Sequence, residues 1–401
     1  MEWGIDTGGG LFCKKESDMI IENVKIFGED MTFTEGRAAV EDGRFVKPDQ
    51  ASGDVVDGEG CFMIPGLVDI HFHGCMGDDF CDASLQAVEN MAKYEASVGV
   101  TSICPATMTL AEEDLHKIMK NAAEHQRAVA EKKAAGQWDG KGAKLVGINM
   151  EGPFISEKKK GAQAADHIRK CDTALFRKLQ EESGGLIRLV DIAPENDGAM
   201  EFIREVKDEV VISIAHTVAD YDTASKALEE GASHVTHLYN AMPPFSHRAP
   251  GVIGAARDDD KCHVEMICDG IHIHPSVVRA TFAMFGADRI ILISDSMRAA
   301  GLTDGQYTLG GQDVFVKGSL ATLADGTIAG SVTDLMGCLK TAVLKMGIPL
   351  EDAVTCTTVN PAKEIGVYDR CGSISVGKDA DFVLLDADLN VKAVYVNGVK
   401  Q

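Results

Sequence analysis

The chain has 401 residues and carries 39 Lys and Arg against 62 Asp and Glu, which gives a formal net charge of −23. This acidity argues against nucleic acids and anionic membrane surfaces as partners, because both repel a negative chain. The composition, 45% hydrophobic and 25% charged, is typical of a globular protein with a sizeable core. The sequence has no apolar run near the roughly 20 residues that a membrane-spanning helix needs.

The cysteines and the first residues indicate where the protein works. Eleven cysteines, an odd number without CxxC spacing, indicate reduced and mostly buried thiols. Residues 1–18 have neither the basic start nor the apolar segment of a signal peptide. We therefore predict a cytoplasmic protein in which residues 1–18 form a loose N-terminal extension.

The pattern of the chain changes at Pro65. Residues 19–64 hold short alternating segments broken by Gly and Asp, which predict one part of a small β domain. Eight strands are then predicted at 67–72, 100–104, 144–150, 187–192, 210–215, 233–236, 263–268 and 289–294. Helices are predicted near 83–98, 111–135, 172–183, 198–208, 220–230 and 275–286. This alternation predicts an α/β fold with a (β/α)8 TIM barrel over residues 65–360.

Two further segments complete the predicted organisation. The connection 237–262 is rich in Pro and Gly and lacks a clear helical pattern, so we expect a long active-site loop. Residues 361–401 return to strand patterns and end near the Asn397-Gly398 turn. We predict that the segments 19–64 and 361–401 pair into one small β-sandwich domain. A separate C-terminal hairpin is the alternative.

Polar side chains recur at the carboxyl ends of the predicted strands. His71 and His73 follow the first strand and point to the same side, because alternate residues of a strand share a face. Two such imidazoles provide half of a metal site. The ends of later strands supply Glu151, His216, His237, Asp269 with His272, and Asp295. Barrel enzymes build their active sites at the carboxyl ends of the strands. Nitrogen and oxygen ligands without thiolates favour Zn²⁺ or Fe²⁺.

Each of these residues also has a structural alternative. An HxH pair often arises by chance, and His216 or His237 could be a hydrogen-bonded core histidine. Glu151 could be a carboxylate at a helix end, and Asp295 could cap a helix. Their recurrence at five or six strand ends of one barrel favours a metal site.

The motifs together resemble a known family. They are Pro65-Gly66-Leu67-Val68-Asp69-Ile70-His71-Phe72-His73-Gly74, Glu151-Gly152-Pro153-Phe154, Ala215-His216-Thr217, Thr236-His237-Leu238-Tyr239-Asn240-Ala241-Met242, Asp269-Gly270-Ile271-His272 and Ser294-Asp295. In this order they resemble the N-acetylglucosamine-6-phosphate deacetylases of the amidohydrolase superfamily, from about Met19 to the C-terminus. The resemblance implies a barrel with a small β domain, which agrees with the predicted strands.

The resemblance also implies roles for single residues. Glu151, His216 and His237 would hold one divalent metal, His71 and His73 would add a second, and Asp295 would be the acid–base residue. The residues implied to contact the substrate are Ala162, Gln163, Asn240, Ala241, Arg248, His272, Ile328, Ala329 and Gly330. Gln163 stands where many members carry a histidine, so it can donate a hydrogen bond but cannot act as a cation. In the family, the arginine that matches Arg248 reaches the neighbouring subunit of a homodimer.

The implied reaction is hydrolysis of the acetamide of N-acetyl-D-glucosamine 6-phosphate in amino-sugar catabolism. The alternatives are the corresponding galactosamine derivative, or another amidohydrolase that acts on an N-acyl or cyclic amide. Hydantoinase-type sites usually need a bridging lysine at a strand end, and we find none in this sequence. A non-catalytic barrel would have lost metal ligands, whereas this chain has the full set.

Overall fold

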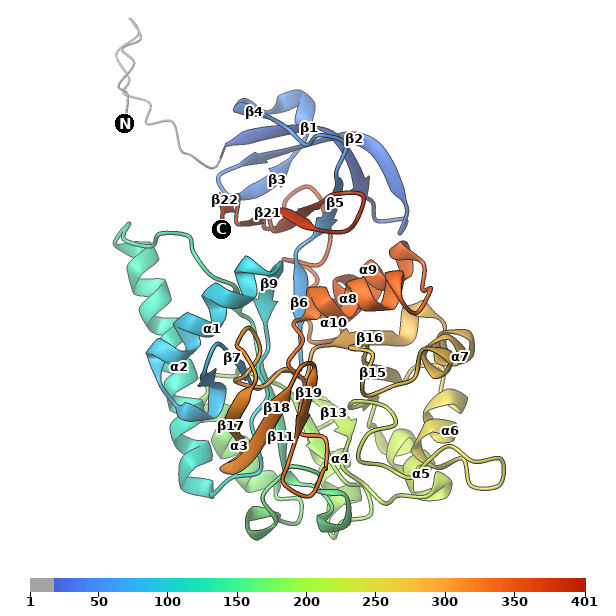
Figure 1. Ribbon diagram of the computed structural model, residues 1–401. Helices are drawn as coiled ribbons and strands as arrows, with labels where there is room; N and C mark the ends of the chain where they lie inside the picture. Colours follow the sequence, from blue (N-terminus) through green and yellow to red (C-terminus); the bar gives the residue numbers. More distant parts are fainter. Residues whose placement is uncertain (1–17) are drawn as a thin grey trace, which may run out of the picture.

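A computed structural model of the chain describes residues 18–401 (Figure 1). A small β domain lies at the top of the view, above a larger barrel surrounded by helices. The architecture confirms the predicted α/β barrel with a β domain built from both ends of the chain. The predicted extension, residues 1–18, lies outside the described residues except for Asp18.

Strands from both ends of the chain form one mixed sheet in the β domain. They are β1 (Met19–Phe27), β2 (Phe33–Glu41), β3 (Arg44–Val46), β4 (Asp54–Asp57), β5 (Phe62–Pro65), β20 (Phe382–Leu385), β21 (Val391–Val396) and β22 (Val399–Lys400). β5 pairs antiparallel with β20, with Pro65 opposite Phe382. The rings of Phe382 and Tyr395 stack at 4.4 Å in a core that also contains Met63. The C-terminal strands therefore complete this domain and do not form a separate hairpin.

The barrel has the eight parallel strand positions that the sequence predicts. They are β6 (Leu67–Asp69), β9 (Val100–Ile103), β10 (Lys144–Leu145) continued by β11 (Ile148–Phe154), β12 (Ile187–Ile192), β13 (Val211–Ile214), β14 (His234–Val235), β15 (His263–Ile267) and β16 (Ile290–Ile293). A bridge between Ala106 and Asn149 joins the two parallel ladders. The barrel closes where the backbone N–H of Asp295 donates to the carbonyl of His71 over 2.9 Å.

Amphipathic helices cover the outside of the barrel. They are α1 (Leu85–Ser97), α2 (Glu112–Ala134), α3 (Thr173–Glu182), α4 (Ala199–Val206), α5 (Tyr221–Glu230), α6 (Gly251–Asp258), α7 (Pro275–Phe285), α8 (Leu335–Leu344), α9 (Leu350–Thr357) and α10 (Val359–Glu364). α4 shows the principle: it buries Ala199, Phe202, Ile203 and Val206 at helical spacing.

One prediction about the connections is wrong. The connection 237–262 was expected to lack a helix, yet Gly251–Asp258 forms α6. Two glycines give this eight-residue segment low intrinsic helix propensity, so its local sequence hides the helix. Packing stabilises α6 instead, because Val252 and Ile253 are fully buried and the helix lies against α5.

A second sheet follows the eighth barrel strand and was not predicted. It consists of β17 (Gly305–Leu309), β18 (Gln312–Lys317) and β19 (Leu320–Thr322), paired antiparallel. Its apolar face packs on Met108 and Met297. Short elements complete the fold: β7 (Gly74–Cys75), β8 (Asp78–Asp79) and the 3₁₀ turns η1 (Pro48–Gln50), η2 (Phe80–Asp82), η3 (Glu157–Lys159), η4 (Ala165–His167) and η5 (Ala287–Arg289).

Two findings concern thiols and membranes. Within residues 18–401, all ten cysteines are free, and all but Cys81 are buried. In the same part of the chain, no helix combines the length and apolarity that crossing a bilayer requires.

Lys144 links the barrel to the β domain. Its ammonium group lies 2.8 Å from Asp379 Oδ2 and also contacts Asp381, while its side chain is 14% exposed. Burial alone would lower the pKa of Lys144, but the two carboxylates raise it above its usual range. The lysine therefore stays charged and compensates two buried acids where the two domains meet.

We expect Lys144→Met to destabilise the protein by about 3–5 kcal/mol, because it removes the cation that contacts buried Asp381 and leaves Asp379 only its outer partners Arg370 and Arg44. Urea unfolding monitored by circular dichroism measures this change. Lys117→Met is the matched control: it removes an exposed lysine paired with Glu113 and Asp114, and the unfolding midpoint should hardly move. An equal effect of both substitutions would show that the link contributes no more than a surface ion pair.

Candidate metal centre and active site

The predicted site residues converge on a cavity of about 380 Å³ at the carboxyl ends of the barrel strands. The predicted residues that line it are His73, Glu151, Ala162, Gln163, His216, His237, Asn240, Ala241, His272, Asp295, Ile328 and Gly330. His71 and Ala329 are fully buried next to these residues in the chain. Arg248 is exposed and does not line the cavity of its own chain.

Glu151, His216 and His237 form the first cluster. Glu151 Oε1 lies 3.0 Å from His216 Nε2 and 3.3 Å from His237 Nε2, and the two nitrogens are 3.1 Å apart. Ligand atoms around a tetrahedral Zn²⁺ lie about 3.3 Å apart, given bonds of about 2.0–2.1 Å. His216 Nδ1 hydrogen-bonds the carbonyl of Lys159 at 2.8 Å, which directs the lone pair of Nε2 towards the cluster. This donor set fits a divalent metal.

His71 and His73 form the second cluster with the same glutamate. His73 Nε2 lies 3.4 Å from Glu151 Oε2, and His71 Nε2 lies 3.7 Å from Glu151 Oε1. His71 is completely buried, and its Nε2 has no hydrogen-bond partner among the described residues. A buried nitrogen without a hydrogen-bond partner costs free energy unless a bound ion or ligand contacts it. The second cluster therefore also fits a metal, with Glu151 shared between the two.

Four side chains reach the cavity from equivalent places on different strands. His71, His216, His237 and Asp295 each lie two residues beyond the last residue of β6, β13, β14 and β16. Three of them have left-handed backbone, with φ of 43° at His216, 31° at His237 and 48° at Asp295. This conformation costs free energy in residues with a side chain and tends to cluster at functional sites. Here it coincides with the point where each strand turns away from the barrel.

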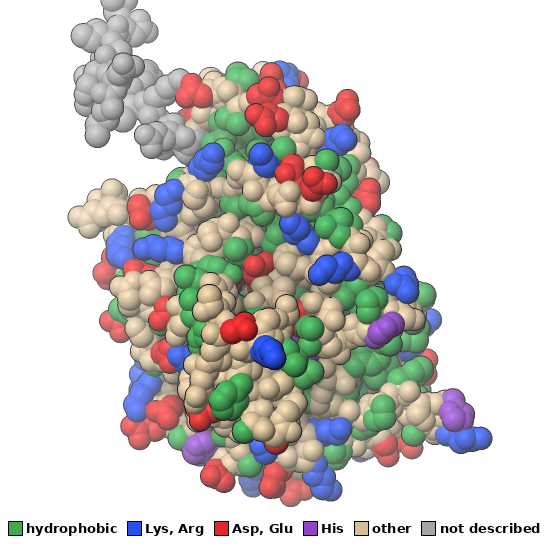
Figure 2. Space-filling view, in the orientation of Figure 1, with side chains coloured by type: hydrophobic (Ala, Val, Ile, Leu, Met, Phe, Trp, Pro, Cys, Tyr) green, Lys and Arg blue, Asp and Glu red, His purple; other side chains and the backbone are tan. Residues whose placement is uncertain are grey.

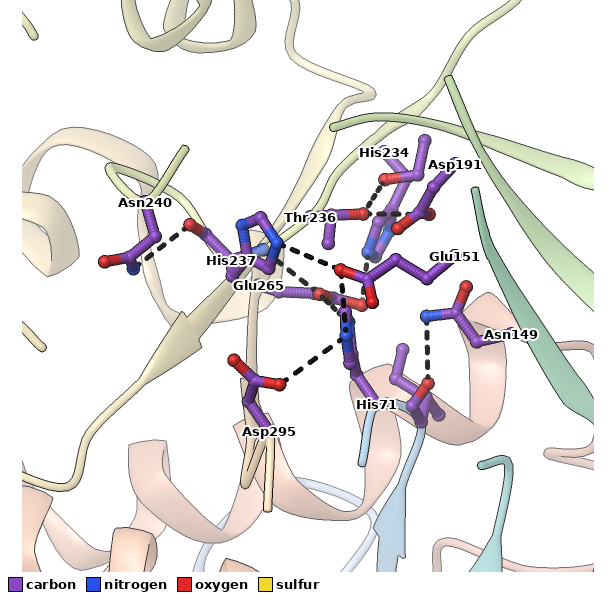
Figure 3. Close-up of polar contacts among 12 residues, drawn as sticks. His71, Asn149, Glu151, Asp191, His234, Thr236, His237, Asn240, Glu265 and Asp295 are labelled. Carbon is purple, nitrogen blue, oxygen red and sulfur yellow. Dashed lines mark hydrogen bonds and ion pairs between the residues drawn. The ribbon is translucent and has the colours of Figure 1, made fainter. Parts of the chain in front are cut away.

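Asp295 faces the second cluster from the last strand. Its Oδ1 lies 3.4 Å from His73 Nε2. The same oxygen lies 3.8 Å from His71 Nε2 (Figure 3). Burial alone would raise the pKa of Asp295, but its contacts with His73 and His71 hold this pKa below its usual range. An ionised carboxylate beside the clusters can accept a proton from a water molecule held there.

The comparisons with known proteins agree with this geometry. The sequence profile of the Amidohydrolase family matches residues 62–400. The chain is 41% identical over 386 residues to N-acetylglucosamine-6-phosphate deacetylase of Bacillus subtilis (strain 168), covering 93% of this chain and 94% of that protein. It is 30% identical over 375 residues to N-acetylgalactosamine-6-phosphate deacetylase of Escherichia coli O157:H7, covering 93% of this chain and 97% of that protein.

Among solved structures, a mutant N-acetyl-D-glucosamine-6-phosphate deacetylase from Mycobacterium smegmatis matches with a TM-score of 0.85 and 32% identity. The match covers 96% of this chain and 99% of that one, and that protein was solved in complex with N-acetyl-D-glucosamine-6-phosphate. The chain belongs to the N-acetylglucosamine-6-phosphate deacetylases of the amidohydrolase family. The family predicted from the motifs is thereby confirmed.

Gln163 contacts the first cluster directly. Its Nε2 donates to Glu151 Oε2 over 2.7 Å, and its Oε1 accepts from the backbone N–H of Thr109 over 2.6 Å. The side chain is 2% exposed, so both ends of the amide are occupied inside the protein. The substrate contact implied for Gln163 stays a prediction, whereas its contact with a candidate ligand is a feature of the structure.

His272 lines the cavity and pairs with a buried carboxylate. Its Nδ1 lies 2.7 Å from Asp269 Oδ2. Burial lowers the pKa of His272, but Asp269 outweighs burial and raises this pKa above its usual range. His272 is therefore suited to hold an anionic group.

Glu265, a fully buried residue of β15, was not predicted from the sequence. Its Oε2 lies 2.9 Å from His71 Nδ1 and accepts from the backbone N–H of His237 over 3.1 Å. The Nε2 of buried His234 lies 3.2 Å from Glu265 Oε1. The available signal was a carboxylate between the apolar residues Val264 and Met266, which is unusual in a buried strand.

Metal content should separate the two clusters. Glu151→Ala removes the residue they share and should abolish tight binding at both positions, whereas His73→Ala should remove one ion and leave the other. Elemental analysis of the dialysed protein measures ions per chain. His116→Ala, which alters a histidine on α2 that pairs with Glu182, should leave the content unchanged. Retention of all metal by Glu151→Ala would place the ions elsewhere.

Proposed function

We propose that this chain hydrolyses the acetamide of N-acetyl-D-glucosamine 6-phosphate to D-glucosamine 6-phosphate and acetate. The observation that carries this proposal is the placement of Glu151 between two pairs of histidines, beside the ionised Asp295, in one cavity. Identity of 41% to the Bacillus subtilis deacetylase supports the reaction and the sugar. The reaction belongs to amino-sugar catabolism.

We assign the metal positions from the two clusters. Glu151, His216 and His237 would hold the first ion, and His71 and His73 would hold a second with Glu151. A divalent ion such as Zn²⁺ or Fe²⁺ supplies Lewis acidity when bound, which lowers the pKa of water and polarises a carbonyl. The histidine nitrogens and the carboxylate oxygens suit either metal.

Asp295 would carry the proton during amide cleavage. Its Oδ1 would accept a proton as water attacks the acetyl carbon, and would return it to the sugar nitrogen as the C–N bond breaks. The products are acetate and the free amine, so atoms and protons balance. A positioned proton carrier is typically worth about 10²–10⁴-fold in rate.

The remaining residues would bind the sugar and its acetyl group. The residues that line the cavity and would define its shape are Ala162, Gln163, Asn240, Ala241, Ile328 and Gly330, with Ala329 buried beside them. The phosphate is a dianion and the chain carries −23, but fields beyond roughly 8 Å are screened at physiological salt. Figure 2 shows Lys and Arg interspersed with Asp and Glu over the visible face, without a large patch of one sign. Groups that line the cavity, such as His272, would therefore decide phosphate binding.

Arg248 would complete the site of a second subunit. It lies in the exposed connection before α6, next to His247, which its Nη1 contacts at 2.7 Å. Three prolines between Pro243 and Pro250 restrict this connection, so it can hold an arginine away from its own barrel. We infer a homodimer in which Arg248 binds the phosphate across the two-fold axis.

Two further assignments accompany the proposal. The buried free thiols favour a reducing compartment, so we place the protein in the cytoplasm. We keep the domain limits of 19–64 and 361–401 for the β domain and 65–360 for the barrel, although α10 crosses the second limit. The N-acetylgalactosamine derivative remains the second candidate substrate, because an enzyme named for it is 30% identical.

The proposed reaction predicts a specific effect of Asp295→Asn. The wild-type protein should release acetate from N-acetylglucosamine 6-phosphate with a higher kcat/KM than from the galactosamine derivative. Asp295→Asn should lower turnover by about 10²–10⁴-fold with metal content retained. The control Asp220→Asn makes the same change at the cap of α5 and should have no effect. A loss below tenfold in Asp295→Asn would assign the proton transfer to another group.

Arg248 can be tested with mixed dimers. Arg248→Ala should raise KM for the phosphorylated sugar far more than for unphosphorylated N-acetylglucosamine, because it removes a charge-assisted phosphate contact. Mixing Arg248→Ala with Asp295→Asn chains should restore activity, since one site of the hybrid keeps both groups. Arg257→Ala, at the end of α6, is the control for a nearby exposed arginine. Confirmed subunit exchange without regained activity would contradict a shared site.

A further inference from the structure

A buried row of alternating carboxylates and imidazoles starts at His71. Glu265 Oε2 lies 2.9 Å from His71 Nδ1, and Glu265 Oε1 lies 3.2 Å from His234 Nε2. The row continues from His234 Nδ1 to Glu364 Oε1 over 2.9 Å, and from Glu364 Oε2 to His263 Nδ1 over 2.9 Å. Figure 3 shows the part of this row that contains His71, Glu265 and His234.

The row connects the cavity to the opposite end of the barrel. The side chains of Glu265 and His234 are fully buried, and that of Glu364 is 7% exposed. His263, the first residue of β15, is 31% exposed in its side chain. The members come from β14, β15 and α10, so the fold must be complete before they meet.

Charges within the row compensate each other. Burial alone would lower the pKa of His234, but Glu265 and Glu364 raise it to about 10. Burial would raise the pKa of Glu364, but His234 and His263 lower it to about 2. His234 is then a cation between the two carboxylates: its Nδ1 donates to Glu364, and its Nε2 forms an ion pair with Glu265 at 3.2 Å. This pairing removes much of the cost of burying two charged acids.

Glu265 also connects the two metal clusters. Glu265 Oε2, which faces His71, also accepts a hydrogen bond from the backbone N–H of His237 over 3.1 Å. The backbone of His237 is left-handed, with φ of 31°. A histidine ligand that donates its second N–H to a carboxylate has a fixed tautomer and ring orientation and a more basic ligand nitrogen. In His71 the ligand nitrogen is Nε2, the atom that faces Glu151 and Asp295.

We propose that Glu265, His234 and Glu364, together called the Glu265 brace, hold His71 as a ligand and thereby set the affinity of the second metal position. The proposal rests on the proposed function, because it assumes that His71 binds metal. In this arrangement Glu265 positions His71, His234 holds Glu265 through their contact at 3.2 Å, and Glu364 holds His234 through a hydrogen bond of 2.9 Å. The influence of each residue therefore decreases with its distance from His71 along the row.

Titration of the metal-free protein with Zn²⁺ tests the brace. Glu265→Gln keeps an oxygen for His71 and His237 but removes the charge. It should weaken the second ion by about 10–100-fold with little change in the first. Glu364→Gln should have a smaller effect in the same direction. The matched control is Glu182→Gln. It removes the charge of a carboxylate on α3 that pairs with His116, away from the clusters, and it should change the affinity of neither metal position. Thermal unfolding of each variant, followed by circular dichroism, establishes that it is folded.

Three outcomes would overturn the brace. They are an unchanged second affinity in folded Glu265→Gln, equal losses at both positions, and a larger effect of Glu364→Gln than of Glu265→Gln. The titration uses Zn²⁺ without substrate, so its result is independent of the reaction. A wild-type protein that binds two ions but does not release acetate would refute the proposed function and leave the brace standing.

Discussion

The carboxylate of Glu151 must remain charged inside the barrel, and the rest of the site depends on this requirement. Burial alone would raise the pKa of Glu151, yet its contacts with His216 and His237 hold the pKa well below its usual range. A buried ion costs several kcal/mol unless each oxygen finds a partner. Oε1 faces His216 and His237, while Oε2 faces Gln163 and His73. The pairing that stabilises the charge also creates the two candidate metal positions.

The barrel supplies this pairing because parallel strands end at one rim. Four polar residues of the site follow a strand by two residues, where the backbone leaves the barrel and the side chain can turn inwards. The left-handed backbone of His216 and His237 is held by neighbouring contacts, among them the hydrogen bond to Glu265. The β domain lies at the other end of the barrel and takes no direct part in the site (Figure 1). Its ion pair with Lys144 stabilises the scaffold instead.

Much of this arrangement could be predicted from local patterns. The eight strand positions follow from apolar runs of four to eight residues, and the candidate ligands follow from polar residues placed at their ends. The pairing of the two termini was also predictable, because both segments read as strands with nothing else to cover their apolar faces. Helix α6 was not predictable, because its glycines give low helix propensity and only packing against α5 stabilises it.

The sequence alone determined the class of fold, the family and the candidate metal ligands, because period, turn residues and motif spacing are local properties. Tertiary structure decided what each polar group touches. The sequence motifs assign Gln163 to the substrate and Glu151 to the metal, yet Gln163 donates a hydrogen bond to the carboxylate of Glu151. In the sequence, Glu265 is a polar residue between apolar neighbours, yet its carboxylate contacts both the ring of His71 and the backbone N–H of His237. Such contacts join residues up to 194 positions apart, so no local pattern encodes them. Only the closed barrel brings these groups within hydrogen-bond distance.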